Sequence, residues 1–374
     1  MKYSNFINKN TNPSRLGFGL MRLPIIENDN GQINYKESRN LVEKSLELGI
    51  NYFDTAYVYH ERQSEIFAGE IFKDIRDKVY LATKLPVWKV EKPGDFEYIL
   101  DAELTKMQTD YIDFYLLHAL DKERFQMVKD HHIYESLVKA KNDGKVRYIG
   151  FSFHDDLDTF KEIIDTYEFD FCQIQLNYLD ENYQAGLEGM KYAKEKGLGV
   201  VVMEPLRGGQ LANLPASIKD KLGNYTPQSL AFSYLLNLEE VDVILSGMNE
   251  IEQIEENAKV FSEISPNSLS EEQLNKINYL KNEIATRLKV DCTRCNYCMP
   301  CPAGVKIPGI FSIYNNKYIF EESQKATDNY KKLVEKNSDQ SQCIECGLCE
   351  SKCPQHLNII EDLKSAHKDL NGGI

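Results

Sequence analysis

Hydrophobic positions recur with two different periods through the first 262 residues. Short runs rich in β-branched and aromatic residues are typical of buried strands, and longer segments with apolar residues three and four apart are typical of helices. Strands are predicted within residues 16–23, 51–59, 79–83, 112–117, 146–152, 171–176, 199–203 and 241–245. Helices are predicted near 35–48, 64–75, 97–108, 133–142, 157–167, 186–196, 228–238 and 250–261.

This regular alternation predicts an α/β fold. Eight strand–helix units over about 250 residues match the (β/α)8 or TIM barrel in number and in size. A doubly wound open sheet is the alternative, but no Gly-x-Gly-x-x-Gly turn follows the first strand to support it. We therefore expect residues 1–262 to form a barrel.

The pattern changes after residue 262. A capping box at 270–273 precedes one helical stripe formed by Leu274, Ile277, Ile284 and Leu288. We interpret 263–290 as a linker helix packed on the barrel. Residues 291–374 then form a smaller domain, in which 307–320 and 321–334 have helical patterns.

Composition narrows the classes of function. The chain has 374 residues, 42% of them hydrophobic, and a net charge of −14. Such acidity argues against nucleic acid and anionic membrane surfaces as partners. No apolar run is long enough to span a bilayer, and the first residues show no signal-peptide core. We expect a soluble, cytoplasmic protein.

Eight of the nine cysteines lie in two runs, whereas Cys172 stands alone in an apolar strand. In a cytosolic chain such clustering indicates metal rather than disulfides. The second run has the spacing of bacterial ferredoxins, in which three thiolates hold one [4Fe–4S] cubane and the fourth reaches another. Zinc remains the alternative, although it usually takes separated Cys-x-x-Cys pairs. The runs are Cys292, Cys295, Cys298 and Cys301, then Cys343, Cys346, Cys349 and Cys353.

Two [4Fe–4S] clusters with crossed ligands follow from that spacing. One cluster would take Cys292, Cys295, Cys298 and Cys353, and the other would take Cys343, Cys346, Cys349 and Cys301. The first run has one residue fewer before its last cysteine than the second. With its helices, the domain resembles the α-helical ferredoxin type of respiratory reductase subunits.

Three of the predicted strands end in titratable residues, namely Asp54, Lys84 and His118, and Tyr59 follows the first of them. The carboxyl ends of parallel barrel strands meet at one face, where such folds hold their chemistry. Each residue alone has an ordinary interpretation as a helix cap, a solvated lysine or a strand-end histidine. Together they predict a catalytic site.

At these four residues the chain resembles the aldo/keto reductases, whose tetrad of Asp, Tyr, Lys and His falls on Asp54, Tyr59, Lys84 and His118. The resemblance implies reduction of a carbonyl, or oxidation of an alcohol, with Tyr59 as general acid and base. Lys84 would lower the pKa of the phenol, Asp54 would hold the lysine, and His118 would orient the substrate oxygen. Trp88, Tyr57 and His154 are candidate substrate-facing residues in the loops.

The same resemblance implies a site for NAD(H) or NADP(H). Ser152 and Gln175 match the pair that holds the carboxamide, and Arg207 is a candidate counter-charge for a pyrophosphate. The full set of matched positions is Ser152, Gln175, Met203, Glu204, Pro205, Leu206, Arg207, Gly208, Gly247, Met248, Asn249, Gln253, Glu256 and Asn257.

Several of these positions depart from the family pattern. Phe153 replaces an asparagine, Met203 replaces the ring that stacks on the nicotinamide, and Glu204 replaces a serine. Gly247 and Gln253 stand where the family's cations grip the 2′-phosphate of NADP. These departures predict a weakened preference for NADPH.

The number of electrons transferred leaves three interpretations open. An iron–sulfur cluster passes one electron at a time, whereas a nicotinamide transfers a hydride, which carries two electrons. The protein could be a nicotinamide-dependent reductase with structural or regulatory clusters. It could instead accept electrons from ferredoxin or another redox partner through the clusters and a bound flavin, and a barrel phosphate site can hold FMN. In the third, the barrel is a non-catalytic scaffold of an electron-transfer subunit. The four-residue tetrad argues against this one.

Overall fold

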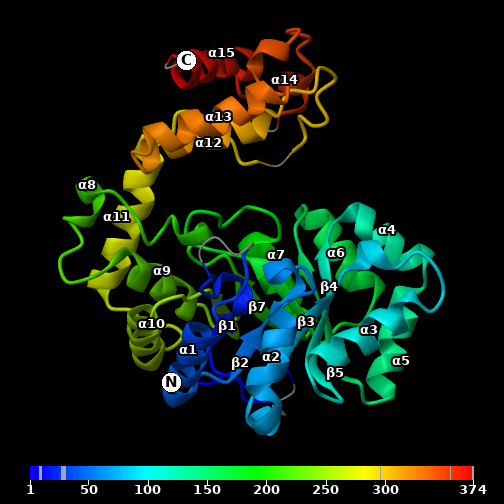
Figure 1. The fold of residues 1–374 in the computed structure, drawn as a ribbon. Helices are drawn as coiled ribbons and strands as arrows, with labels where there is room; N and C mark the ends of the chain where they lie inside the picture. The colour runs from blue at the N-terminus through cyan, green and yellow to red at the C-terminus, as the bar shows by residue number, and fades with distance from the viewer. Residues whose placement is uncertain (8–10, 27–30, 295, 354, 373–374) are drawn as a thin grey trace. The chain divides into compact units, whose positions relative to one another are not determined.

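A computed structural model describes residues 1–7, 11–26, 31–294, 296–353 and 355–372. The chain divides into two compact units, Met1–Gly208 with Ala231–Ser270, and Gly209–Leu230 with Glu271–Ile374. The first unit is a closed barrel in which the eight strands pair in chain order, all parallel (Figure 1). This confirms the predicted fold. The strands are β1 (Leu16–Gly19), β2 (Tyr52–Asp54), β3 (Tyr80–Leu85), β4 (Ile112–Leu120), β5 (Val146–Phe153), β6 (Phe171–Gln175), β7 (Gly199–Met203) and β8 (Val243–Ser246).

The helices of the barrel follow the predicted segments closely. They are α1 (Tyr35–Glu47), α2 (Ser64–Phe72), α3 (Asp95–Lys106), α5 (Ile133–Asn142), α6 (Leu157–Thr166), α7 (Gly186–Glu195), α9 (Pro227–Leu236) and α10 (Ile251–Glu263). The sequence pattern missed α4 (Lys122–Asp130), which begins at the cap Asp121. The predicted first strand is also too long, because its last residues form a 3-10 turn, η1 (Leu20–Arg22).

The amino end of the barrel is closed by the N-terminal segment. Phe6 is fully buried and packs against Phe114 and Phe171, with ring centroids 5.2 and 5.8 Å away. Gly199 opens β7 at this point, and a Cβ there would lie only 2.1 Å from the Phe6 ring. Glycine is therefore required where the plug meets the strand, and the opposite, carboxyl-end face remains for chemistry.

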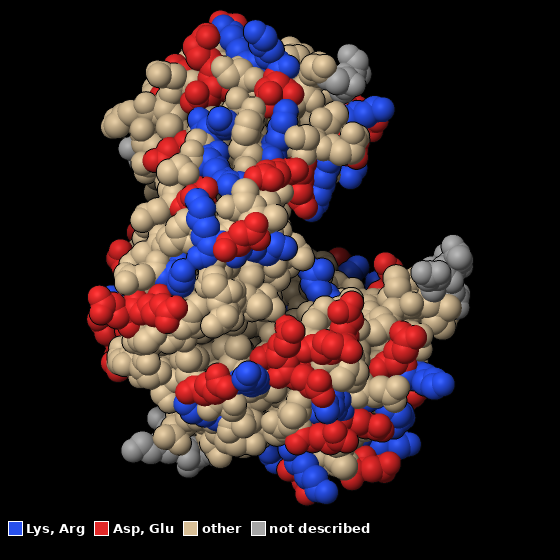
Figure 2. All heavy atoms as spheres, turned by 90° about the vertical axis from the view of Figure 1, so that its left-hand side faces the viewer, with Lys and Arg blue, Asp and Glu red and all other residues tan. Residues whose placement is uncertain are grey.

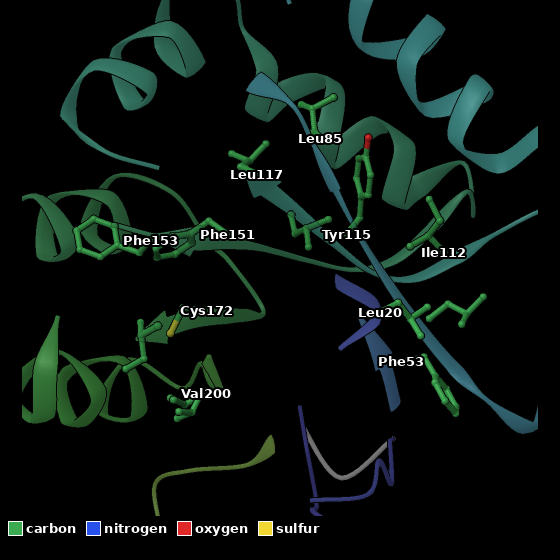
Figure 3. Close-up of a cluster of buried hydrophobic side chains, with 14 of the residues drawn as sticks. Leu20, Phe53, Leu85, Ile112, Tyr115, Leu117, Phe151, Phe153, Cys172 and Val200 are labelled. Atoms are coloured by element: carbon green, nitrogen blue, oxygen red, sulfur yellow. The ribbon is translucent and has the colours of Figure 1, made fainter. Parts of the chain in front are cut away.

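The outer face of the strands carries the main hydrophobic core. Alternate residues of β4 point in opposite directions, so that Phe114 and Leu116 fill the barrel while Tyr115 and Leu117 pack under the helices. Figure 3 shows part of this outer core, including Phe151, Phe153 and Cys172. Cys172 is completely buried there, as expected for a small core residue.

The second unit is helical and contains the cysteine runs. Its helices are α8 (Ala216–Lys219), α11 (Glu271–Arg287), α12 (Ile307–Ile319), α13 (Ser323–Glu335), α14 (Leu348–Lys352) and α15 (Ile359–Asn371). Arg287 joins its parts, since its guanidinium contacts Glu321 at 2.9 Å and Ser217 at 3.0 Å. The capping box thus opens α11, which belongs to this unit.

The net charge is unevenly divided between residues 291–374, which contain the cysteine runs, and residues 1–290. Residues 291–374 contain 10 Lys and Arg against 11 Asp and Glu, so almost all of the net charge of −14 lies in residues 1–290. On the face drawn in Figure 2, acidic side chains gather over the barrel, and the second unit shows both signs interleaved. None of the helices in the described ranges is long and apolar enough to cross a membrane.

Candidate active site and cysteine cavities

Lys84 lies at the carboxyl-end half of β3 and is almost completely buried. Its ammonium donates hydrogen bonds to Asp54 Oδ1 at 2.7 Å and to the carbonyl of Thr55 at 2.8 Å. Burial is the largest single effect and disfavours the charge, but the charges of Asp54 and Tyr59 and their hydrogen bonds together outweigh it and raise the pKa of Lys84. Burial also raises the pKa of Asp54, against the effect of Lys84. The lysine is therefore held as a fixed positive charge inside the barrel mouth.

Tyr59 opens the 3-10 turn η2 (Tyr59–Arg62), which follows β2, and its ring centroid lies 5.1 Å from Lys84 Nζ. The resemblance to the aldo/keto reductases implies that the ammonium lowers the pKa of this phenol. The lysine does act in that direction, but burial is the larger effect and raises the pKa of Tyr59 above its ordinary value of 10. The phenol is thus protonated at neutral pH, as a proton donor must be.

His118 comes from β4 and lies within an irregularity in the pairing of β4 with β5, between Leu117 and Leu120. Ala119 adopts a left-handed φ of 53° there, and its N–H donates to Ser152 Oγ at 2.7 Å. This bulge fixes the direction of the histidine. The His118 ring stands edge-on to Tyr59, with centroids 6.4 Å apart, and lies 5.5 Å from the ring of Trp88.

The imidazole of His118 is neutral. Burial and the positive charges around it, Lys84 among them, lower its pKa from 6.5 to about 3. Its Nδ1 is buried and has no hydrogen-bond partner among the described residues. A neutral ring with a free nitrogen beside the phenol can hydrogen-bond an incoming oxygen without adding a charge.

The same shift predicts how stability depends on pH. Below pH 6.5 the unfolded chain binds a proton at His118 that the folded protein does not bind, so acidification favours unfolding until about pH 3. Because of His118, the free energy of unfolding should fall by about 2 kcal/mol when the pH is lowered from 7.5 to 5. His118→Gln should remove that part of the loss. Denaturant unfolding can be followed by the fluorescence of Trp88, the only tryptophan, with exposed His131→Gln as the control. An unchanged pH dependence in His118→Gln would contradict the assignment.

Two glutamines of β6 differ in whether their side-chain amides are already hydrogen-bonded within the protein. Gln175, the predicted carboxamide ligand, donates from Nε2 to Asp180 Oδ2 at 3.1 Å. Gln173 is paired in register with Ser152 on the neighbouring strand, and its buried Oε1 has no hydrogen-bond partner in the described part of the chain. Its Nε2 lies 3.6 Å from the sulfur of Met203. Gln173 is not among the positions that the resemblance implies, and its free oxygen makes it a further candidate. Counting inward-pointing residues from Ser152 across the strands could have found it.

The loop after β7 begins with Glu204 and Pro205 and continues through Leu206 to Gly208. Arg207 and Gly208 have left-handed φ values of 49° and 67°. Arg207 Nε lies 3.6 Å from Asp180 Oδ2, the carboxylate that also accepts from Gln175. The cation proposed for a pyrophosphate is thus already paired with a buried acid.

The loop after β8 contains the remaining matched positions. Gly247 is exposed, Met248 is buried, and the Asn249 N–H donates to Gln253 Oε1 at 3.1 Å. Gln253 in turn donates to Glu250 at 3.3 Å, so a negative charge stands beside it. On the same helix, α10, Glu256 is exposed, and Asn257 is buried and donates to Ser246 at 3.4 Å.

In the second unit the cysteines line two cavities. One is lined by Cys298, Cys301, Cys343, Cys346 and Cys349. The other is lined by Cys292, Cys298 and Cys353. Cys295 lies outside the described residues, and among those described no three Cys, His, Asp or Glu side chains converge on a single metal ion. Each cavity contains cysteines from both runs, and Cys298 lines both cavities.

Sequence comparisons agree with this architecture. The profile of the aldo/keto reductase family matches residues 15–221, and that of the 4Fe-4S dicluster domain matches residues 291–358. L-galactose dehydrogenase of Arabidopsis thaliana is 27% identical over 289 residues, which cover 71% of this chain and 89% of that protein. The NADH-specific methylglyoxal reductase of Escherichia coli (strain K12) is 25% identical over 292 residues, covering 65% and 88%.

Solved structures show the same relationship. The aldo-keto reductase AKR11C1 from Bacillus halodurans, in its holo form, superposes with a TM-score of 0.62 at 27% identity, covering 74% of this chain and 95% of that one. The closed barrel and the family match over more than half of the sequence lead to one conclusion. This chain is an oxidoreductase that belongs to the aldo/keto reductase family and carries a C-terminal 4Fe-4S domain.

Proposed function

We propose that this oxidoreductase interconverts a small carbonyl compound and its alcohol, with Tyr59 as the general acid and base. The observation that carries the proposal is the buried ammonium of Lys84, held at 2.7 Å by Asp54 and beside the Tyr59 ring. A buried ion pair beside a phenol is costly to maintain for stability alone. It is useful where negative charge develops on a phenol oxygen, as happens when Tyr59 gives up its proton.

Each residue of the tetrad then has a distinct part. Tyr59 donates its proton to the carbonyl oxygen during reduction and regains it during alcohol oxidation. Lys84 stabilises the phenolate that forms, and Asp54 keeps the lysine charged and in position. His118, neutral and with a free nitrogen, orients the substrate oxygen. Trp88 covers the imidazole at 5.5 Å and provides an apolar wall for the substrate.

A nicotinamide dinucleotide fits the residues at the barrel mouth, and when bound it would supply the hydride. The unpaired Oε1 of Gln173, beside Ser152, is a ready acceptor for the amide protons of a carboxamide. Met203 offers a polarisable side chain next to Gln173 where the family has a ring. Glycines at 208 and 247 allow the backbone to approach a phosphate closely.

We predict that NADH binds at least as well as NADPH. Gln253 carries no charge and is bonded to Glu250, so a 2′-phosphate would meet a negative field there. One relative of this chain is an NADH-specific reductase, which supports the same preference. Gln253→Arg should shift the affinity ratio toward NADPH by about tenfold, the effect of one exposed ionic contact. Fluorescence titration with both cofactors measures it, and a parent that binds NADPH more than about tenfold tighter would refute the prediction.

For the second unit we propose two [4Fe–4S] clusters, one in each cysteine cavity, which would supply one-electron transfer. The cavity walls support this assignment, because each brings together thiols from both runs among apolar residues such as Ile307. Zinc, the alternative, usually takes separated Cys-x-x-Cys pairs, whereas each run here places four cysteines close together in the sequence. A ferredoxin or a similar carrier is the partner class that such clusters serve. The near-neutral charge of residues 291–374 would allow an acidic carrier to approach.

The test of the proposed function compares electron donors for the anaerobically purified protein. Oxidation of NADH with a panel of aldehydes and ketones should be detected without any further donor, and Lys84→Met should abolish it. Turnover with reduced ferredoxin alone, together with release of FMN identified by mass, would favour the flavin-dependent alternative instead. Activity that survives Lys84→Met would place the chemistry outside the tetrad.

A further inference from the structure

Arg22 lies close to two loops whose residues match the nucleotide-binding positions, those after β7 and after β8. It ends η1, directly after β1, and β1 pairs with β8. Its Cβ, Cγ and Cδ lie along the backbone of Gly247, where an added Cβ would come within 3.0 Å of the arginine. Its Nη2 reaches the next loop, 3.6 Å from the corresponding point at Gly208. Glycine at 247 is therefore what gives the arginine its path.

The guanidinium of Arg22 forms no ion pair with the described residues. Within the described ranges, no carboxylate or carbonyl accepts a hydrogen bond from it, and the side chain is exposed. Arg207, the other cation of this region, is paired with the buried Asp180. The two loops that Arg22 approaches also carry acidic residues, Glu204 in the loop after β7 and Glu250 in the loop after β8.

The base of Arg22 is held firmly although its end is free. The carbonyl of Leu20 accepts a hydrogen bond from Ser64 Oγ at 3.2 Å, and Thr55 Oγ1 donates to the same serine at 2.7 Å. Both Ser64 and Thr55 are buried. The turn that carries Arg22 is thus tied to the segment between Asp54 and α2, which also supplies Tyr59.

We propose that Arg22 binds the diphosphate of the nicotinamide dinucleotide. This rests on the proposed function and adds a residue to its cofactor site. Only the aliphatic part of the side chain lies on Gly247, and the charge is at Gly208, in the loop after β7. Gln253, where a 2′-phosphate would sit, is on α10 and pairs with Glu250 instead. Arg22 therefore serves a group that NADH and NADPH share, by a two-pronged guanidinium–phosphate contact.

The experiment measures binding, not turnover, in the full-length protein. Arg22→Gln should weaken NADH and NADPH equally, by about tenfold to a hundredfold, the range for a charge-assisted hydrogen-bonded contact. The affinity of the parent should fall with added salt, and the variant should lose most of that dependence. Exposed Arg39→Gln on α1 is the matched control and should change neither affinity. Loss of NADPH binding alone, or no loss for either cofactor, would overturn the inference.

Gly247→Ala provides a second, independent variant. The added methyl group would come within 3.0 Å of the Arg22 side chain, which must shift by a few tenths of an ångström, so NADH should bind more weakly than to the parent. In the double variant with Arg22→Gln, the alanine should cost nothing further, because no arginine remains to be displaced. Additive losses would show that Gly247 acts through something other than Arg22.

ADP-ribose separates this inference from the proposed function. If the parent binds ADP-ribose with the same dependence on Arg22 but does not bind NADH or NADPH, the diphosphate site stands and the nicotinamide proposal falls. If NADH binds equally to parent and Arg22→Gln, the proposed function stands and the role of Arg22 is refuted. Failure of the parent to bind any of the three would refute both.

Discussion

Replacing Tyr59 by phenylalanine should lower kcat for carbonyl reduction by about 10²- to 10⁴-fold, the usual contribution of a positioned general acid. The affinity for NADH should remain close to that of the parent, because the hydroxyl acts only when charge develops on the substrate oxygen. The shape of the site should persist, since the ring keeps its place near Lys84 and edge-on to His118. Steady-state kinetics together with NADH titration separate the two effects.

Tyr98→Phe is the matched control, because Tyr98 lies on α3 with 77% of its surface exposed. It should leave kcat unchanged. If Tyr59→Phe turns over within about tenfold of the parent, the proton has another source. Tyr57 would then be examined first, since its ring lies within 4.8 Å of both Arg62 and Lys106 and its phenol is partly exposed.

Replacing Cys346 by serine should remove one of two clusters. The parent should contain close to eight iron atoms and eight sulfides per chain, at four of each per cubane, and the variant about four. Cys346 is exposed and lines the cavity with Cys301, Cys343 and Cys349, so the loss should fall on that cluster. The second unit should also unfold at lower denaturant concentration, because cluster binding contributes to its folding free energy.

Iron and sulfide analysis of anaerobically purified protein, with the visible absorption spectrum, measures this loss. Cys172→Ala is the control, because Cys172 is buried in the barrel wall and should not affect the metal content. Stoichiometric zinc without sulfide in the parent would contradict the assignment of iron–sulfur clusters. A parent with only four irons would limit the domain to one cluster.

The sequence by itself determined the barrel, because a strand buried on both faces and a helix buried on one leave different hydrophobic periods. It also determined which residues stand at the strand ends, since Asp54, Lys84 and His118 close apolar runs whose carboxyl ends must share one face. The cysteine spacing alone indicated the class of the second domain, and the dicluster match confirms that class.

Only the tertiary structure decided which polar groups remain available. Gln175 and Gln173 lie two residues apart on one strand, and nothing in their order shows that Asp180 occupies the first and not the second. The pKa of Tyr59 depended on burial, which spacing cannot predict, and burial outweighed the lysine. The position of Arg22 depended on the closure of β1 against β8, which joins the first strand to the last. The period of the hydrophobic pattern shows which way a side chain faces. The contacts that it makes with residues distant in sequence depend on how the strands and helices pack together.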